Sequence, residues 1–160
     1  MLGHANRAPD LFLLRDNPGI YQILLMSHRW LAWIALAAAI AAIGTLSRRH
    51  GDGPGRARPI WTWTFQASLA AQALIGVLLY LRFSPFTAGV RANLDVVLDD
   101  PTLRYWNAVH PLVGVLAVAA MIGGPIYARR ADTAEAANRR ARWALVLAAA
   151  LSAAAIPWTA

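Results

Sequence analysis

Two histidines, His28 and His110, lie in apolar stretches of helix length, and their type and spacing suggest metal or cofactor chemistry. His28 stands 18 residues before the end of its stretch at Leu46, and His110 stands 17 residues before the end of its own at Tyr127. At a helical rise of about 1.5 Å per residue, both imidazoles lie about 26 Å from the same membrane surface. Imidazoles at one depth on separate helices of a bundle are the arrangement that axial ligation of a haem iron requires.

Four apolar stretches must position these histidines, and they predict an all-α membrane protein built as a four-transmembrane-helix bundle. A bilayer core of about 30 Å needs about 20 apolar residues in a helix. The fourth stretch is short, and we expect Arg140 and Arg142 to snorkel at one end while Trp158 anchors the other. A single domain, 1–160, contains all the predicted spans, which are 20–46, 60–81, 103–127 and 143–158.

The composition agrees with a membrane domain. Hydrophobic residues make up 58% of the chain and charged residues 14%, which a soluble core of 160 residues would not hide. Because the chain has no cysteine, disulfides, thiolate metal ligands and thiol nucleophiles are excluded. We recognise no cleavable signal before the first span, so that span is expected to act as its own insertion signal.

The arginines predict the orientation. The loops after the first and third spans carry nine of the fifteen basic residues, all of which are arginine. The positive-inside rule therefore places these loops in the cytoplasm and both termini on the outer, periplasmic side of a bacterial inner membrane. The net charge of +7 is a topology signal in this interpretation. Nucleic acid is not an expected partner, because the arginines are not interleaved with aromatic residues.

The surroundings of the histidines fit a porphyrin. Gly114, one turn after His110, leaves room for a flat macrocycle against the backbone. Arg29 and Arg104, near the outer mouth, can pair with haem propionates. Four aromatic residues either line the same pocket or belong to the aromatic belt at the membrane interface; they are Trp30, Trp33, Tyr105 and Trp106.

Other roles for the histidine pair stay open. Each imidazole can make a structural hydrogen bond, and one alone can hold a chlorophyll-type pigment. A proton relay or a different metal is also possible, although two histidines do not complete a zinc site. Gln66 and Gln72 on the second span are candidates for a quinone site or for amides that bridge helices. His4 and His50 are expected to be exposed bystanders.

The connecting segments carry weaker signals. Apolar residues spaced by three and four predict a short surface helix over Arg91–Leu98, with a plain loop as the alternative. The segment Ala128–Arg142 lacks Gly and Pro, so helix can extend past the membrane surface there. Pro111 lacks a backbone N–H and is expected to kink the third span or soften its first turn.

Short motifs stand in order along nearly the whole chain. They are His28-Arg29-Trp30 in the first span, Gln72, Leu74-Ile75-Gly76-Val77-Leu78-Leu79-Tyr80 and Ser84-Pro85 at the second, Arg104-Tyr105-Trp106 and His110 at the third, and Ile156-Pro157-Trp158 at the end. This order resembles a family of small bacterial four-span membrane proteins described as cytochrome-b-like. The resemblance implies a four-helix fold and a haem b.

One residue departs from the family pattern. The family's first-span histidine precedes the Arg-Trp pair by four residues, where this chain has Leu25, whereas His28 directly precedes Arg29. A shift of three residues keeps the helix face and moves the ring about 4.5 Å along the axis. His110 matches the pattern directly.

Two functions follow as expectations. One haem b near the outer face cannot carry an electron across the bilayer, so it would pass electrons locally between quinol and a periplasmic carrier or another membrane subunit. The alternative is a non-catalytic accessory subunit that packs against a larger respiratory or photosynthetic complex. No catalytic residues are predicted in either case, and the lipid bilayer is a partner in both.

Overall fold

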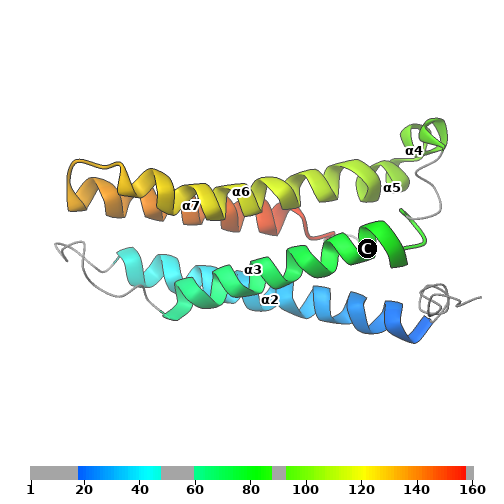
Figure 1. The fold of residues 1–160 in the computed structure, drawn as a ribbon, viewed down its shortest axis with the longest axis horizontal. Coiled ribbons are helices and arrows are strands. Elements are labelled where there is room, and N and C mark those ends of the chain that lie inside the picture. Colours follow the sequence, from blue (N-terminus) through cyan, green and yellow to red (C-terminus); the bar gives the residue numbers. More distant parts are fainter. Residues whose placement is uncertain (1–17, 48–59, 88–92, 158–160) are drawn as a thin grey trace, which may run out of the picture.

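The described part of the chain is entirely helical, as predicted, and forms two helical hairpins side by side (Figure 1). The first pairs α2 (Pro18–Ser47) with α3 (Ile60–Leu78), and the second pairs α6 (His110–Arg129) with α7 (Ala134–Ala154). Helix α2 also packs along α7, so the hairpins form one bundle in which α2 and α6 run in the same direction. The computed structural model describes residues 18–47, 60–87 and 93–157.

Shorter helical segments extend α3 and α6 at the same end of the bundle (Figure 1). A π-helical turn, η1 (Leu79–Phe83), continues α3. On the other hairpin, α4 (Leu94–Asp99) and α5 (Pro101–Arg104) lead into a second π-helical turn, η2 (Tyr105–Val109), which runs directly into α6.

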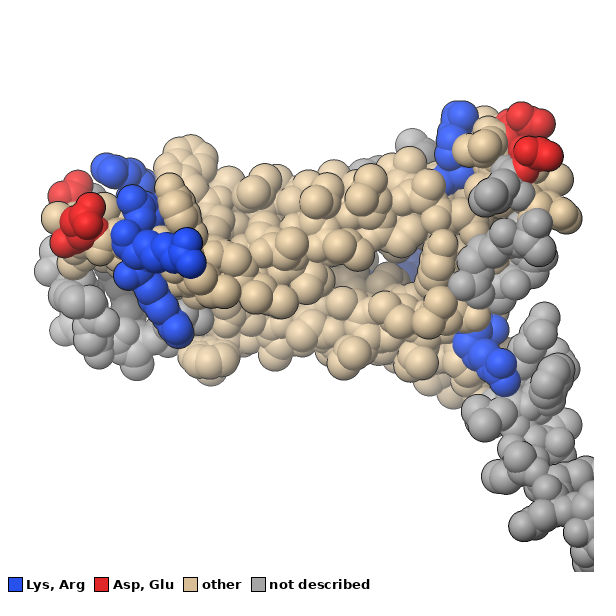
Figure 2. All heavy atoms as spheres, turned by 45° about the horizontal axis from the view of Figure 1, so that its top comes forward, with Lys and Arg blue, Asp and Glu red and all other residues tan. Residues whose placement is uncertain are grey.

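Within the described ranges, three helices are long and apolar enough to cross a membrane, and they coincide with the first three predicted spans. They cover Pro18–Ser47, Ile60–Phe83 and Pro101–Arg129. Figure 2 shows the middle of the visible face without charged side chains, while Arg, Asp and Glu gather toward the two ends. This is the distribution that a bilayer imposes on a helical bundle.

Helix α7 is not among the three. It starts at Ala134, before the predicted span 143–158, and only its second half is apolar. Its first half carries charged residues that lower the mean hydropathy: Glu135, Arg139, Arg140 and Arg142. The side chain of Thr133 starts the helix by accepting a hydrogen bond from Ala136 N at 3.2 Å. The expected helix within Ala128–Arg142 is therefore present, interrupted only by the turn before α7. Trp158, the predicted anchor, lies outside the described residues.

The predicted surface helix is present as α4, although residues 91 and 92 lie outside the described ranges. Val97 is buried, whereas Val96 and Leu98 are exposed. Asp100 then caps α5, its carboxylate accepting hydrogen bonds from Thr102 N at 2.7 Å and Leu103 N at 3.0 Å. This cap fixes where the third span begins.

The core is built mainly from alanine and lies on the side of the histidines that faces the α6–α7 turn. Phe65 is the one large side chain that is fully buried within the described ranges. Small residues allow close approach of the helices, and a Cβ on Gly124 would collide with that of Ala144 across α6 and α7. The remaining core residues are Ala35, Ala38, Ala39, Ala42, Leu69, Ala117, Leu145 and Ala148.

Candidate haem-ligand site

The structure brings His28 and His110 together across the two hairpins. Their ring centroids lie 6.1 Å apart, and the ring planes make an angle of 65°. His28 comes from α2 and His110 from the first residue of α6, two helices that run in the same direction (Figure 1). The two rings therefore lie next to each other in an edge-on arrangement, on separate helices of the bundle.

A main-chain carbonyl fixes each imidazole. His28 Nδ1 lies 3.1 Å from the carbonyl oxygen of Gln72 on α3, and His110 Nδ1 lies 2.9 Å from that of Ala155 at the end of α7. A carbonyl oxygen only accepts, so Nδ1 must carry the hydrogen in both rings. Each neutral ring then has its lone pair on Nε2, and no described residue donates a hydrogen bond to either Nε2.

The separation of the two ring centroids is close to that of two imidazoles on one metal. An imidazole nitrogen binds a transition metal at about 2.0 Å, so two rings in line on one metal have centroids about 6 Å apart. A metal-bound histidine ordinarily donates its second N–H to a carbonyl or carboxylate, as both rings do here. Within the described ranges, no three His, Cys, Asp or Glu side chains come together. The remaining ligands would have to come from a cofactor, which a porphyrin's four nitrogens provide.

Gly76 on α3 makes room for the His28 ring. A Cβ at Gly76 would lie 3.2 Å from His28 Cε1 and 3.8 Å from Nδ1. The missing side chain thus lets the ring rest against the α3 backbone, one turn beyond the Gln72 carbonyl that it bonds. Gln72 was predicted as a quinone ligand or bridging amide, and its main-chain carbonyl is the group that meets the histidine. Its side-chain Oε1 is buried without a hydrogen-bond partner.

The His110 side of the site depends on the end of α7. The Ala155 carbonyl accepts from both His110 Nδ1 and the Tyr105 hydroxyl, each at 2.9 Å. Ala155 is the C-cap of α7, where carbonyls have no partner within the helix. The negative end of the α7 dipole therefore points at the imidazole N–H.

The π-helical turn η2 directly precedes His110 and contains Asn107, whose carbonyl has an acceptor role between the hairpins. In an α-helix the Asn107 carbonyl would accept from residue 111, but Pro111 has no N–H. The Tyr80 hydroxyl on η1 takes this place, donating to Asn107 O at 3.1 Å. Pro111 thus frees a carbonyl that ties the two hairpins together, which is a larger effect than the local softening expected from the sequence.

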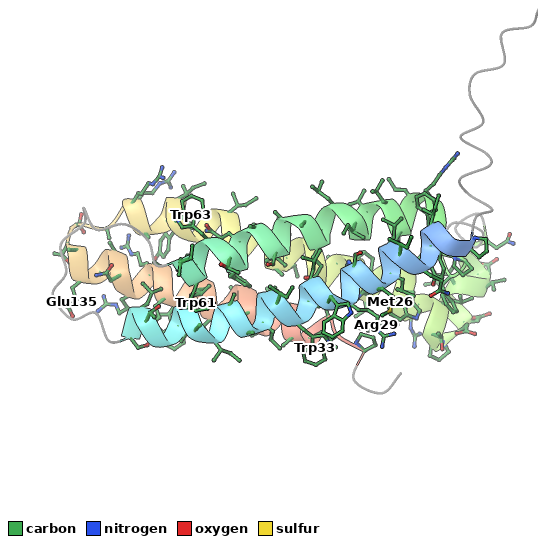
Figure 3. The ribbon with its side chains drawn as sticks, turned by 90° about the horizontal axis from the view of Figure 1, so that it is seen from below. Met26, Arg29, Trp33, Trp61, Trp63 and Glu135 are labelled. Carbon is green, nitrogen blue, oxygen red and sulfur yellow. The ribbon has the colours of Figure 1, made fainter. Side chains whose placement is uncertain are left out.

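Two of the four candidate aromatic residues lie against His110. The ring centroid of Trp106 is 5.2 Å from that of His110, and the centroid of Tyr105 is 5.9 Å from it. Trp30 and Trp33 are instead 62% and 49% exposed on α2. Figure 3 shows Trp33 with Arg29 and Met26 along the exposed side of this helix.

Gly114 borders open space. It follows His110 by one helical turn on the same face, and a Cβ there would meet nothing within 4 Å. Figure 2 shows the surface hollowed between the two hairpins toward the α4 and α5 end. The backbone at Gly114 is therefore open, and a macrocycle beside it stays a prediction.

The two predicted propionate partners both lie at the protein surface, and their pairing with propionates stays a prediction. Arg29 is exposed on α2. Arg104 is also exposed, and its guanidinium donates to Leu98 O at 3.4 Å. His4 and His50 lie outside the described residues, as do the arginines of the first predicted cytoplasmic loop.

In comparisons with known proteins, no family model matches the chain, and no curated protein or solved structure shows significant similarity to it. The resemblance to cytochrome-b-like proteins therefore remains a prediction from short motifs.

Proposed function

We propose that this chain is a small membrane cytochrome in which His28 and His110 are the axial ligands of one haem b. The observation that carries the proposal is the ring pair itself: centroids 6.1 Å apart, with each Nδ1 held by a carbonyl. When bound, a haem b supplies reversible one-electron oxidation and reduction of its iron. The two Nε2 atoms would hold the iron, and the two carbonyls would increase the basicity of the imidazoles.

The position of the pair favours local electron exchange. His110 lies near the start of the third span, Pro101–Arg129, and far from its basic end. We infer that electrons pass between quinol in the outer leaflet and a partner subunit or periplasmic carrier. This assignment takes the arginine-rich ends as cytoplasmic, in a bacterial inner membrane.

We further propose that α7 is the fourth span. Leu145 and Ala148 of α7 are buried in the same core as α2 and α6, so this half of α7 lies at the same depth as those spans. Five of the nine residues before Trp143 are polar or charged, so this part of α7 would continue past the membrane surface. Both termini would then be on the outer side.

Reduced-minus-oxidised absorption spectra test the haem proposal. The protein is purified in mild detergent from cells with adequate haem, beside His28→Ala, His110→Ala and the matched control His50→Ala. We expect a haem b spectrum in the wild type and in His50→Ala, and none in the other two variants. Free imidazole should restore the spectrum of His28→Ala by filling the vacated ligand position.

Two outcomes contradict the proposal. A colourless wild-type protein would leave the accessory subunit of a larger complex as the better explanation. A spectrum that survives one of the two substitutions unchanged would mean a single imidazole ligand, as a chlorophyll-type pigment or a different haem geometry would use.

A further inference from the structure

A groove of about 590 Å³ lies on the surface of the second hairpin, at the end opposite to the α4 and α5 segments. Helices α6 and α7 form it just before and after the turn that joins them. Its volume falls within the range of about 300–1,000 Å³ that ligand sites occupy. The groove is lined by Ala120, Gly123, Gly124, Tyr127, Arg139, Arg140, Trp143, Ala144 and Leu147.

One end of the groove is cationic and aromatic. Arg140 is half-buried, its guanidinium carbon lying 4.5 Å from the centre of the Tyr127 ring and its Nη1 3.4 Å from the Tyr127 carbonyl. Arg139 lines the same end, and no acidic side chain of the described residues pairs with either arginine. Figure 2 shows basic side chains gathered at this end of the bundle. Two uncompensated guanidinium groups beside exposed aromatic rings suit a phosphate at the membrane interface.

The other end of the groove is apolar and runs toward the middle of the third span. Gly123 leaves it open, because a Cβ there would meet nothing within 4 Å. Ala120 and Leu147 continue it along the helices, and Leu147 is 54% exposed. An acyl chain fits such a strip on a helix that already faces the bilayer.

We propose that this groove binds an anionic phospholipid, with its phosphate on Arg139 and Arg140 and one acyl chain along Gly123. A phosphate group attached to an apolar chain matches both ends of the groove, whereas free phosphate uses only one. The opening lies on the surface of two membrane helices, where lipid is the surrounding solvent. The inference does not depend on haem binding, because the groove and the histidines lie at opposite ends of α6.

Native mass spectrometry of the detergent-purified full chain tests the proposal. The probes are phosphatidylglycerol and phosphatidylcholine with identical acyl chains, and inorganic phosphate alone. We expect phosphatidylglycerol to be retained and phosphatidylcholine to be lost. The double variant Arg139→Gln/Arg140→Gln should bind phosphatidylglycerol about 30-fold more weakly.

Two further variants separate this site from general surface charge. Arg129→Gln/Arg130→Gln removes the same charge from the same end but outside the groove, and should leave binding unchanged. Gly123→Leu keeps every arginine and places a side chain in the acyl strip, where a Cβ meets nothing within 4 Å, so it should also abolish retention.

Equal retention of the two lipids would overturn the proposal. An equal loss of phosphatidylglycerol affinity in the two double arginine variants would also overturn it. So would displacement of the lipid by inorganic phosphate alone, or unchanged retention in Gly123→Leu. Because Gly123→Leu leaves all the charges in place, the test stands even if the Arg139→Gln/Arg140→Gln protein does not fold.

Discussion

Tyr105 and His110 donate hydrogen bonds to the same acceptor, the carbonyl oxygen of Ala155, at equal distances of 2.9 Å. The two donors therefore share the electron density of one oxygen. A stronger hydrogen bond from one donor weakens the hydrogen bond from the other. The Tyr105 hydroxyl therefore weakens the hydrogen bond between His110 Nδ1 and the carbonyl.

Replacing Tyr105 with Phe should lower the midpoint potential of the proposed haem. Without the phenol, the Ala155 carbonyl accepts more strongly from His110 Nδ1, which makes the imidazole a better electron donor and favours oxidised iron. A redox titration followed in the visible spectrum measures this shift. Tyr80→Phe is the matched control, because its hydroxyl bonds Asn107 O instead of touching the histidines, and its potential should stay at the wild-type value. A rise in potential in Tyr105→Phe would contradict the argument.

Filling the space at Gly76 should displace His28. A Cβ at this position already lies 3.2 Å from His28 Cε1, so Gly76→Leu must push the ring away from the Gln72 carbonyl. Overpacking of this kind costs about 1–3 kcal/mol. We expect a matching fall in the free energy of unfolding in SDS titrations, together with loss of haem. Gly44→Leu is the control, because a Cβ at Gly44 meets nothing within 4 Å, and it should keep both properties.

Gly114→Leu should separate haem binding from folding. The open space beside Gly114 accepts a side chain, so the haem-free protein should unfold at the same SDS concentration as the wild type. The same side chain would fill the predicted place of the macrocycle, so haem content per protein should fall sharply. Full haem content in this variant would show that the cofactor lies elsewhere.

Pro111 and Tyr80 should be coupled energetically through the Asn107 carbonyl. Tyr80→Phe alone should cost about 1 kcal/mol by removing its hydrogen bond. In Pro111→Ala the new N–H can bond Asn107 O within the helix, so the added Tyr80→Phe substitution should cost much less. A double-mutant cycle of SDS unfolding measures the difference. A cycle with Pro125→Ala, at the other proline of α6, should show no coupling to Tyr80.

Single cysteines can test the orientation, because the chain has none of its own. We expect Asn93→Cys, before α4, to react with a membrane-impermeant maleimide added outside the cell. Asp132→Cys, in the turn between α6 and α7, should react only after the membrane is opened. The reverse pattern would invert the topology, and labelling of both from outside would contradict a single span, Pro101–Arg129, between the two sites.

The membrane spans and the common depth of the two histidines could be predicted from the sequence, because they depend on the length of apolar stretches and on the helical rise per residue. Those two quantities placed the first three spans within a few residues of the observed helices. The predicted span 143–158 covers only part of α7, because only the second half of this helix gives a hydrophobic signal. The Thr133 cap and the charged residues that follow it extend the helix to Ala134 regardless of hydropathy.

The acceptors of the histidines could not be predicted in the same way. Any residue at position 72 or 155 supplies a carbonyl, so residue type carries no signal for Gln72 O or Ala155 O. Their roles depend on how far apart the helices lie and how each is rotated. Gly76 was visible only as part of a motif, because its effect comes from the ring that packs against it.

Each histidine is oriented from within its own hairpin. The acceptor of His28 follows it by 44 residues on the neighbouring helix α3, and the acceptor of His110 follows it by 45 residues at the end of α7. Each hairpin thus supplies the hydrogen-bond acceptor that orients its own imidazole. A cofactor held by both histidines, as proposed, would therefore lie at the interface between the two hairpins and would link them.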